Sequence, residues 1–387
     1  MGRFSATALL LTLVLALGAC GGGLNFTTPP PPPPPPPSPF SPAFVYISNT
    51  NASTLTGINV AGGKPTRLGT SLPPPGGGPI GMVATGKLLY IANSGSGTIS
   101  GFSFNADTGA LQTLPGSPAV AAPGVRQLAL CPGNSGGATT PKFLYAAADS
   151  GVLGYNITGT GQLTPVPGSP FTAGAQPAAV LTDSACNFLF VASKGSNSIS
   201  VFSVNLGNGF LTPVFGSPFL TGTAPVALAM GDGFLFAANS ASNNVSVYTV
   251  RSGAGSGQFL TQVPGSPFSA GFTPSALVYF SPTLYVANSG SGDISAFTVA
   301  LDSGRLTSVT GSPFLAGTLP MAMIAFSPPA SNVAQQTFLY VANAGSSDLS
   351  GFTIGADGAL TVAQGFPFPA GANPQALVFA CGHCGYP

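Results

Sequence analysis

Apolar and polar positions alternate along short segments that recur seven times in this chain. Each copy holds a strand of the type Leu-Tyr-Val-Ala-Asn, a turn of Gly, Ser and Asn, and a strand of the type Ile-Ser-x-Phe-x-Val. A Leu-Thr segment, Gly-Ser-Pro-Phe and Gly-x-x-Pro follow, and a short apolar run leads into the next copy. Alternation bounded by turn residues predicts β-strands. We therefore expect an all-β chain with four strands in each repeat.

An aromatic residue in the Leu-Tyr-Val-Ala-Asn strand marks the period of the repeat. It falls at Tyr46, Tyr90, Tyr145, Phe190, Phe236, Tyr285 and Tyr340. Successive positions are 44 to 55 residues apart, close to the period of four-stranded propeller blades. One blade cannot bury both of its faces, so the copies must pack on one another and close into a ring. The repeat predicts a seven-bladed β-propeller with antiparallel blades.

The two ends of the repeat array predict how the ring closes. The array begins at residues 44–47 in the pattern of a second strand, and it ends at residues 374–379 in the pattern of a first strand. Seven complete blades arise only if the C-terminal strand joins the N-terminal blade. Such closure removes the exposed edges of an open ring.

We divide the chain into a signal peptide (residues 1–19), a linker (20–42), the propeller (43–381) and a tail (382–387). The first segment is a short apolar run after a cation, which is typical of a signal peptide rather than a membrane span. Its Leu-Gly-Ala-Cys ending resembles the bacterial lipobox, which implies a lipidated Cys20 and an outer-membrane lipoprotein, facing the periplasm or the surface. Nine consecutive prolines in the linker predict an extended spacer.

Charge is scarce in this sequence. Asp, Glu, Lys and Arg make up 4% of the residues, where an ordinary globular domain has about 25%. The net charge is +1, which provides neither a basic surface for nucleic acid nor a basic patch for anionic lipid. We expect no nucleic-acid partner, contact with the membrane only through the lipid anchor, and a monomer.

The motifs Tyr-Val-Ala-Asn, Gly-x-Leu-Thr and Gly-Ser-Pro-Phe in combination resemble the seven-bladed propellers of the lactonase family. That family includes bacterial 6-phosphogluconolactonases, and the related YVTN-repeat surface proteins share the motifs. The resemblance covers residues 43–379. It implies a ligand at the central channel, where the family's inner strands often read Pro-Arg-His with the Arg and His facing the substrate.

The corresponding channel positions in this chain are mostly apolar. The residues after the Pro position are Ile80, Arg126, Ala178, Val226, Ser275, Met321 and Gln375. Only Arg126 keeps the cation, and Gln127 stands where the family has His. We expect any ligand to bind at this channel mouth, around Arg126, Gln127, Ser275, Gln375 and Met321.

Catalytic residues are not evident in the sequence. The sole histidine, His383, lies in the tail, and there is no Glu, so neither a Ser-His-Asp set nor paired glutamates can form. A phosphorylated lactone would need several cations around its phosphate, which argues against a 6-phosphogluconolactonase. We expect no catalytic residue, no cofactor and no metal site.

Four cysteines remain after Cys20, and an even number suggests disulfides in an oxidising compartment. Cys131 and Cys186 follow the inner strands of the third and fourth repeats on the same face of the ring, so they are one candidate pair. Cys381 and Cys384 are a second, local pair in the tail, where free thiols are the alternative.

These observations favour a lipid-anchored binding or scaffolding module of the cell envelope, without catalysis. Its partner would be a small molecule, a glycan or an envelope protein. The resemblance implies the alternative, a hydrolase that opens a neutral lactone. A purely structural surface protein is the second alternative.

Overall fold

A computed structural model describes residues 42–61, 64–69, 72–131, 142–251, 258–328 and 336–381. The signal peptide, Cys20, nearly all of the linker, His383 and Cys384 lie outside the described residues. No helix in the described part of the chain is long and apolar enough to cross a membrane.

Four kinds of strand recur in a fixed order in every blade. The inner strands are β4 (Pro79–Thr85), β9 (Leu128–Cys131), β13 (Pro177–Thr182), β18 (Pro225–Gly231), β23 (Pro274–Phe280), β28 (Pro320–Phe326) and β33 (Pro374–Cys381). The second strands are β1 (Ala43–Asn49), β5 (Leu88–Asn93), β10 (Phe143–Ala148), β14 (Phe188–Ser193), β19 (Phe234–Asn239), β24 (Thr283–Asn288) and β29 (Phe338–Asn343). The third strands are β2 (Thr54–Asn59), β6 (Thr98–Phe104), β11 (Gly151–Ile157), β15 (Ser198–Val204), β20 (Asn244–Val250), β25 (Asp293–Val299) and β30 (Asp348–Ile354).

The outer strands are short. The fourth strands are β3 (Thr66–Arg67), β7 (Leu111–Thr113), β12 (Leu163–Pro165), β16 (Leu211–Pro213), β21 (Leu260–Gln262), β26 (Leu306–Ser308) and β31 (Leu360–Val362). Five blades add a two-residue strand: β8 (Ala119–Val120), β17 (Phe219–Leu220), β22 (Phe268–Ser269), β27 (Phe314–Leu315) and β32 (Phe368–Pro369).

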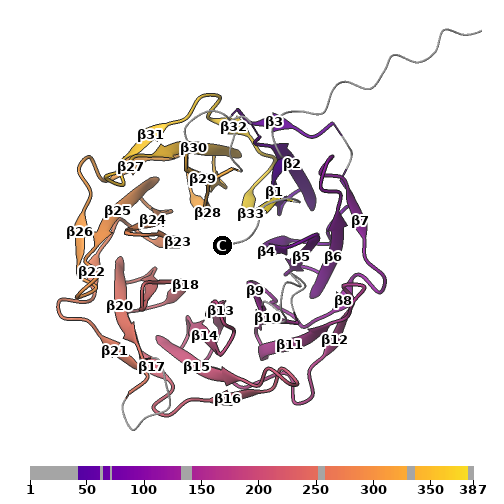
Figure 1. Cartoon of the computed structure of the whole chain (residues 1–387), viewed down its shortest axis with the longest axis horizontal. Coiled ribbons are helices and arrows are strands. Elements are labelled where there is room, and N and C mark those ends of the chain that lie inside the picture. The colour runs from indigo at the N-terminus through magenta and orange to yellow at the C-terminus, as the bar shows by residue number, and fades with distance from the viewer. Residues whose placement is uncertain are drawn as a thin grey trace, which may run out of the picture. The chain divides into compact units, whose positions relative to one another are not determined.

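The strands form seven antiparallel sheets that are arranged in a ring with the inner strands nearest its centre, as Figure 1 shows. Blade 1 holds β1–β3 and β33, blade 2 holds β4–β8, blade 3 holds β9–β12, blade 4 holds β13–β17, blade 5 holds β18–β22, blade 6 holds β23–β27 and blade 7 holds β28–β32. The predicted seven-bladed propeller is confirmed. Five blades have one strand more than the expected four. This extra strand follows Gly-Ser-Pro, or Gly-Phe-Pro in blade 7, and pairs with the third strand of its own blade.

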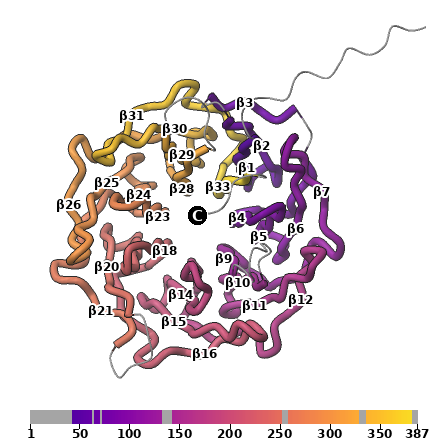
Figure 2. The backbone as a smooth tube through the Cα atoms, viewed as in Figure 1, coloured from indigo at the N-terminus to yellow at the C-terminus, as the bar shows by residue number. Residues whose placement is uncertain are grey.

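The C-terminal strand closes the ring in blade 1, as predicted. Val45, Tyr46 and Ile47 of β1 pair with Phe379, Val378 and Leu377 of β33 in an antiparallel register. In Figure 2 the yellow end of the chain therefore lies beside its indigo beginning. Blade 1 thus contains strands from both ends of the described chain.

Two faces of the ring follow from this topology. The upper face holds the starts of the inner strands and the turns between second and third strands, since Pro79 pairs with Asn93. The lower face holds the turns between inner and second strands, since Cys131 pairs with Phe143. Apolar clusters fill the seams between neighbouring blades.

An asparagine ends the second strand in five blades and is buried in each. Its Nδ2 donates to a hydroxyl of the third strand, as from Asn93 to Ser100 Oγ at 2.9 Å. The glycine of Gly-x-x-Pro packs against the amide, because a Cβ on Gly271 would lie 2.6 Å from Asn288. These contacts explain why Asn and Gly recur together in the repeat.

Candidate functional site

A cavity of about 390 Å³ opens at the upper face, where the inner strands begin. Gln127 lines this cavity. So do all seven residues that follow the Pro position of an inner strand: Ile80, Arg126, Ala178, Val226, Ser275, Met321 and Gln375. The structure therefore brings the five candidate ligand-binding residues into one cavity. Whether they bind a ligand stays a prediction.

Arg126 lies just before the short inner strand of blade 3, and its Nη1 atom has three partners. Its Nη1 atom forms an ion pair with Asp149 Oδ1 at 2.7 Å. The same nitrogen donates to the carbonyl of Gly124 at 2.8 Å and, across the seam, to that of Pro177 at 3.5 Å. Within the described residues its Nη2 and Nε atoms make no hydrogen bond, so those N–H groups remain available to a ligand.

Sequence reasoning missed two charged residues of this site, Asp149 and Lys194. Lys194 lines the cavity. Both occupy the first position after a second strand, where the blades carry Thr50, Ser94, Asp149, Lys194, Ser240, Ser289 and Ala344. Alignment of these turns would have revealed the signal, because only blade 3, which holds Arg126, and the adjacent blade 4 have a charge there.

Gly81 in blade 2 makes room for the backbone of Arg126. A Cβ atom at Gly81 would lie 2.0 Å from the carbonyl oxygen of Arg126. Five blades have Ala at the corresponding register position: Ala179, Ala227, Ala276, Ala322 and Ala376. Blade 2 therefore has glycine at this position because the backbone carbonyl of Arg126 comes too close for a Cβ atom.

The other polar residues of the cavity are partly engaged with the protein. Ser275 Oγ donates to the carbonyl oxygen of Pro320 at 2.6 Å. Gln375 Nε2 donates to Asn373 Oδ1 at 2.7 Å, which leaves its carbonyl oxygen as an acceptor. Met321 contributes apolar surface. The site thus combines apolar walls with a few polar groups, which is how small-molecule pockets are usually built.

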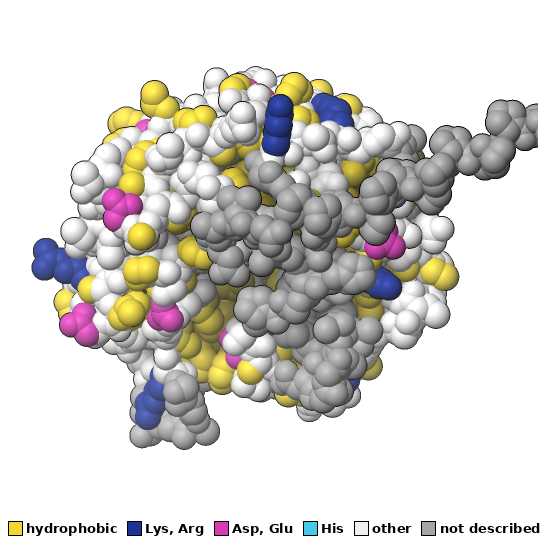
Figure 3. All heavy atoms as spheres, turned by 45° about the horizontal axis from the view of Figure 1, so that its top comes forward, with side chains coloured by type: hydrophobic (Ala, Val, Ile, Leu, Met, Phe, Trp, Pro, Cys, Tyr) yellow, Lys and Arg dark blue, Asp and Glu magenta, His cyan; other side chains and the backbone are white. Residues whose placement is uncertain are grey.

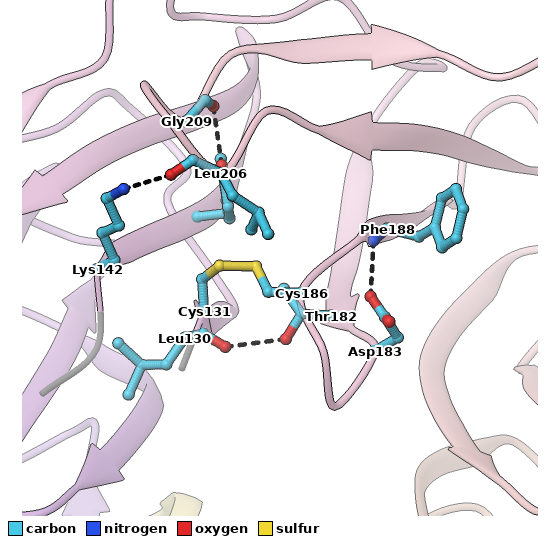
Figure 4. The surroundings of a disulfide bond; sticks show 10 residues. Leu130, Cys131, Lys142, Thr182, Asp183, Cys186, Phe188, Leu206 and Gly209 are labelled. Atoms are coloured by element: carbon cyan, nitrogen blue, oxygen red, sulfur yellow. Dashed lines mark hydrogen bonds between the residues drawn. A yellow bond between two sulfur atoms is a disulfide. The ribbon is translucent and has the colours of Figure 1, made fainter. Parts of the chain in front are cut away.

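A disulfide joins blades 3 and 4 at the lower face (Figure 4). Cys131 ends the inner strand of blade 3, Cys186 lies in the turn after β13, and their Cα atoms are 5.3 Å apart. A hydrogen bond of 2.9 Å from Thr182 Oγ1 to the carbonyl of Leu130 crosses the same seam. Cys381 is also disulfide-bonded, and the expected partner Cys384 lies outside the described residues.

Charged side chains are scattered singly over the surface that Figure 3 shows. No three His, Cys, Asp or Glu side chains gather in the described part of the chain in a way that could hold a metal ion. Against this sparse background, Arg126, Asp149 and Lys194 form a concentration of charge at the junction of blades 3 and 4.

Comparison with known proteins supports the lactonase resemblance. The family described as lactonase, 7-bladed β-propeller, matches residues 147–267. A search of curated protein sequences gives no match. The expected resemblance to lactonase propellers is therefore confirmed at the level of the family description.

Solved structures of similar proteins share the fold. A candidate 6-phosphogluconolactonase from Bacteroides fragilis is 19% identical, with a TM-score of 0.68 over 88% of this chain and 98% of that one. One from Bacteroides uniformis is 16% identical, with a TM-score of 0.69 over 88% and 99%. The periplasmic gluconolactonase of Pseudomonas aeruginosa is 19% identical, with a TM-score of 0.66 over 88% and 99%. At these identities the likeness shows the fold alone.

Proposed function

We propose that this propeller hydrolyses a small, uncharged lactone at the mouth of its central channel. The observation that carries the proposal is the cluster of Arg126, Asp149 and Lys194 beside an apolar cavity. The lactonase family match and the fold shared with a gluconolactonase support it. We therefore favour the lactone hydrolase, which was the alternative from the sequence, over a purely scaffolding role.

The residues can supply the two requirements of lactone opening. Water adds to the carbonyl carbon, and the developing oxyanion takes hydrogen bonds from Nη2 and Nε of Arg126. Asp149, whose side chain is 53% exposed, accepts the proton of the attacking water. The C–O bond of the ring then breaks, and Asp149 returns its proton to the leaving alkoxide. The new carboxylic acid releases its own proton to solvent, which yields a hydroxycarboxylate.

A neutral substrate suits this mouth better than a phosphorylated one. Phosphate groups are typically held by several charge-assisted hydrogen bonds. Here the charge of Arg126 is balanced by Asp149 at 2.7 Å, and Lys194 is the remaining cation among the described lining residues. The apolar walls fit the ring of an unphosphorylated lactone.

Binding without turnover is the second candidate function. The ion pair at Arg126 restrains the group that would stabilise an oxyanion. The described lining of the cavity contains no His, Cys or Glu that could act as a stronger base or nucleophile. A sugar or sugar lactone would then be held unchanged.

Hydrolysis of glucono-δ-lactone, followed by acid release, tests the proposal. We expect a rate clearly above the spontaneous one, and a loss of at least about tenfold in Arg126→Ala. Arg305→Ala changes an exposed arginine far along the ring and should keep full activity. An unaccelerated reaction in the wild type would overturn hydrolysis, and equal rates in wild type and Arg126→Ala would exclude the channel mouth.

We also propose that the ring is a monomer tethered to the outer membrane through Cys20. The support is the lipobox-like sequence and the proline spacer. Labelling with a radioactive fatty acid should mark the wild type and leave Cys20→Ser unlabelled. Fatty-acid incorporation into Cys20→Ser would contradict the tether.

A further inference from the structure

Lys194 carries the unbalanced charge of the channel mouth. Arg126 and Asp149 neutralise one another at 2.7 Å, whereas Lys194 has no ion-pair partner among the described residues. Its side chain is exposed. The mouth therefore has a net positive charge, although the proposed substrate is uncharged.

Hydrogen bonds place the turn of Lys194 next to Arg126. The backbone N–H of Lys194 donates to the carbonyl of Gln176 at 3.0 Å. The next carbonyl along the chain, that of Pro177, accepts from Arg126 Nη1 at 3.5 Å. The two cationic residues are thus attached to consecutive peptide units of blade 4, at the same rim of the cavity.

Hydrolysis changes the charge of the ligand at this rim. A neutral lactone gains little from a lysine, but the ring-opened product carries a carboxylate. An ammonium group at a cavity rim attracts such a carboxylate and donates charge-assisted hydrogen bonds to it. The amides of Gln127 and Gln375 on the same cavity can contact the hydroxyls of the opened chain.

We propose that Lys194 makes the channel mouth a binding site for open-chain hydroxycarboxylates of the sugar-acid class. The inference rests on the proposed function for the identity of the product, and it assigns Lys194 the role of the carboxylate-binding residue. Such a site retains the product after hydrolysis, so the product competes with the lactone.

Calorimetric titration of the propeller with gluconate and with glucitol tests this role. The two probes have the same hydroxylated chain, but only gluconate is charged. We expect gluconate to bind at least about tenfold more tightly, and this preference to disappear in Lys194→Gln while glucitol binding is unchanged. Raising the salt concentration should weaken gluconate binding alone.

Lys87→Gln is the matched control, because Lys87 lies in a turn at the lower face, away from this cavity. This variant should keep the preference for gluconate. Thermal unfolding of both variants shows whether each is folded. Equal affinity for gluconate in wild type and Lys194→Gln would overturn the inference, and so would equal affinity of the wild type for the two probes.

The outcomes also separate this inference from the proposed hydrolysis. Turnover of the lactone without a Lys194-dependent preference for gluconate would leave the hydrolase and remove the anion site. Lys194-dependent gluconate binding without turnover would leave the anion site and point to a binding protein.

Discussion

The phenolic oxygen of Tyr46 donates a hydrogen bond of 2.7 Å to the backbone carbonyl of Gly109, 63 residues further along the chain. The bond runs from the second strand of blade 1 to the turn between the third and fourth strands of blade 2. Three further pairs make the same bond to the next blade, at 2.6 to 2.8 Å: Tyr90 with Gly161, Tyr145 with Gly209, and Tyr285 with Gly358. The aromatic of the repeat therefore couples neighbouring blades.

Removing one of these hydroxyls should destabilise the ring. Tyr90→Phe leaves the buried carbonyl of Gly161 without its donor, which costs about 1–3 kcal/mol in the free energy of unfolding. Tyr340→Phe is the matched control, because the buried hydroxyl of Tyr340 has no partner among the described residues and its loss should cost nothing. Urea titration of both variants measures the difference. Equal losses in the two variants would show that the bond is not the cause.

Alkaline pH should destabilise the protein steeply. Burial raises the pKa of Tyr46, Tyr90, Tyr145 and Tyr340, and mainly burial raises that of Tyr285 to about 12. The unfolded chain loses these protons near pH 10, while the folded ring keeps them. Stability is therefore complete below about pH 10 and falls as the pH rises towards the folded values.

Urea midpoints measured between about pH 7 and pH 11 check this dependence. We expect a nearly flat profile up to about pH 9, followed by a decline that is shallower in Tyr90→Phe than in the wild type. A profile that stays flat to pH 11 would contradict the burial of the phenols.

The sequence predicts the ring because every blade repeats the same pattern of strand and turn residues. The aromatic at Tyr46 and its equivalents, the alternation around it and the turn residues all indicate the same fold. The phase of the two ends indicates the partner of β33 as well. The short fifth strand was not predicted, because Phe219–Leu220 is too brief for any periodic signal and forms only against Ser198–Ile199.

One blade contains a natural test of the recurring asparagine. Asn239 Oδ1 accepts a hydrogen bond from Thr221 Oγ1 at 3.0 Å. In blades 6 and 7 an alanine replaces that threonine, and within the described part of the chain the buried Oδ1 of Asn288 and of Asn343 has no partner. At this position the blades therefore differ by the hydroxyl and one methyl group of threonine, and only the hydroxyl can donate to the amide.

Adding the hydroxyl should stabilise the other blades. We expect Ala316→Thr, which places a donor beside Asn343, to raise the free energy of unfolding by about 1 kcal/mol. Thr221→Ala should lower it by about 1–3 kcal/mol, because it leaves Asn239 Oδ1 unsatisfied. Urea denaturation measures both. Destabilisation by Ala316→Thr would mean that the threonine cannot reach the amide.

The candidate site was less predictable than the fold. The inner-strand pattern identifies Arg126, Ser275 and Gln375 as neighbours, because the blades are equivalent and converge on one channel. It could not show that Asp149 neutralises Arg126, since that contact depends on a turn specific to blade 3. Alignment of the turns after the second strands singles out Lys194 as a charge, but the sequence does not show that this turn reaches the cavity.

Gly81→Ala should disturb the site without removing any of its side chains. The added Cβ would lie 2.0 Å from the carbonyl oxygen of Arg126, so the backbone there must move, at a cost of about 1–3 kcal/mol. We expect weaker ligand binding together with this loss of stability. Ala276→Gly, at the same register of blade 6, should lower stability and leave affinity unchanged. Unchanged affinity in Gly81→Ala would show that Arg126 does not contribute to binding.

The closing strand gives the last prediction. β33 pairs with β1 along its whole length, and Leu377 and Ala380 are buried while Val378 and Phe379 are only partly so. Truncation after Gly371 removes this strand and exposes the edge of β1. Full burial of one such large apolar side chain contributes about 1.5–3 kcal/mol, and a typical domain has only about 5–15 kcal/mol in total.

We therefore expect the chain truncated after Gly371 to be insoluble, and the chain truncated after Cys381 to melt close to the wild type. Soluble expression followed by thermal unfolding separates the two. The contrast is informative because both variants lack the tail, so that only the strand differs. A cooperatively melting fragment that ends at Gly371 would mean that blade 1 can hold its place in the ring without an inner strand, contrary to the pairing of Tyr46 with Val378.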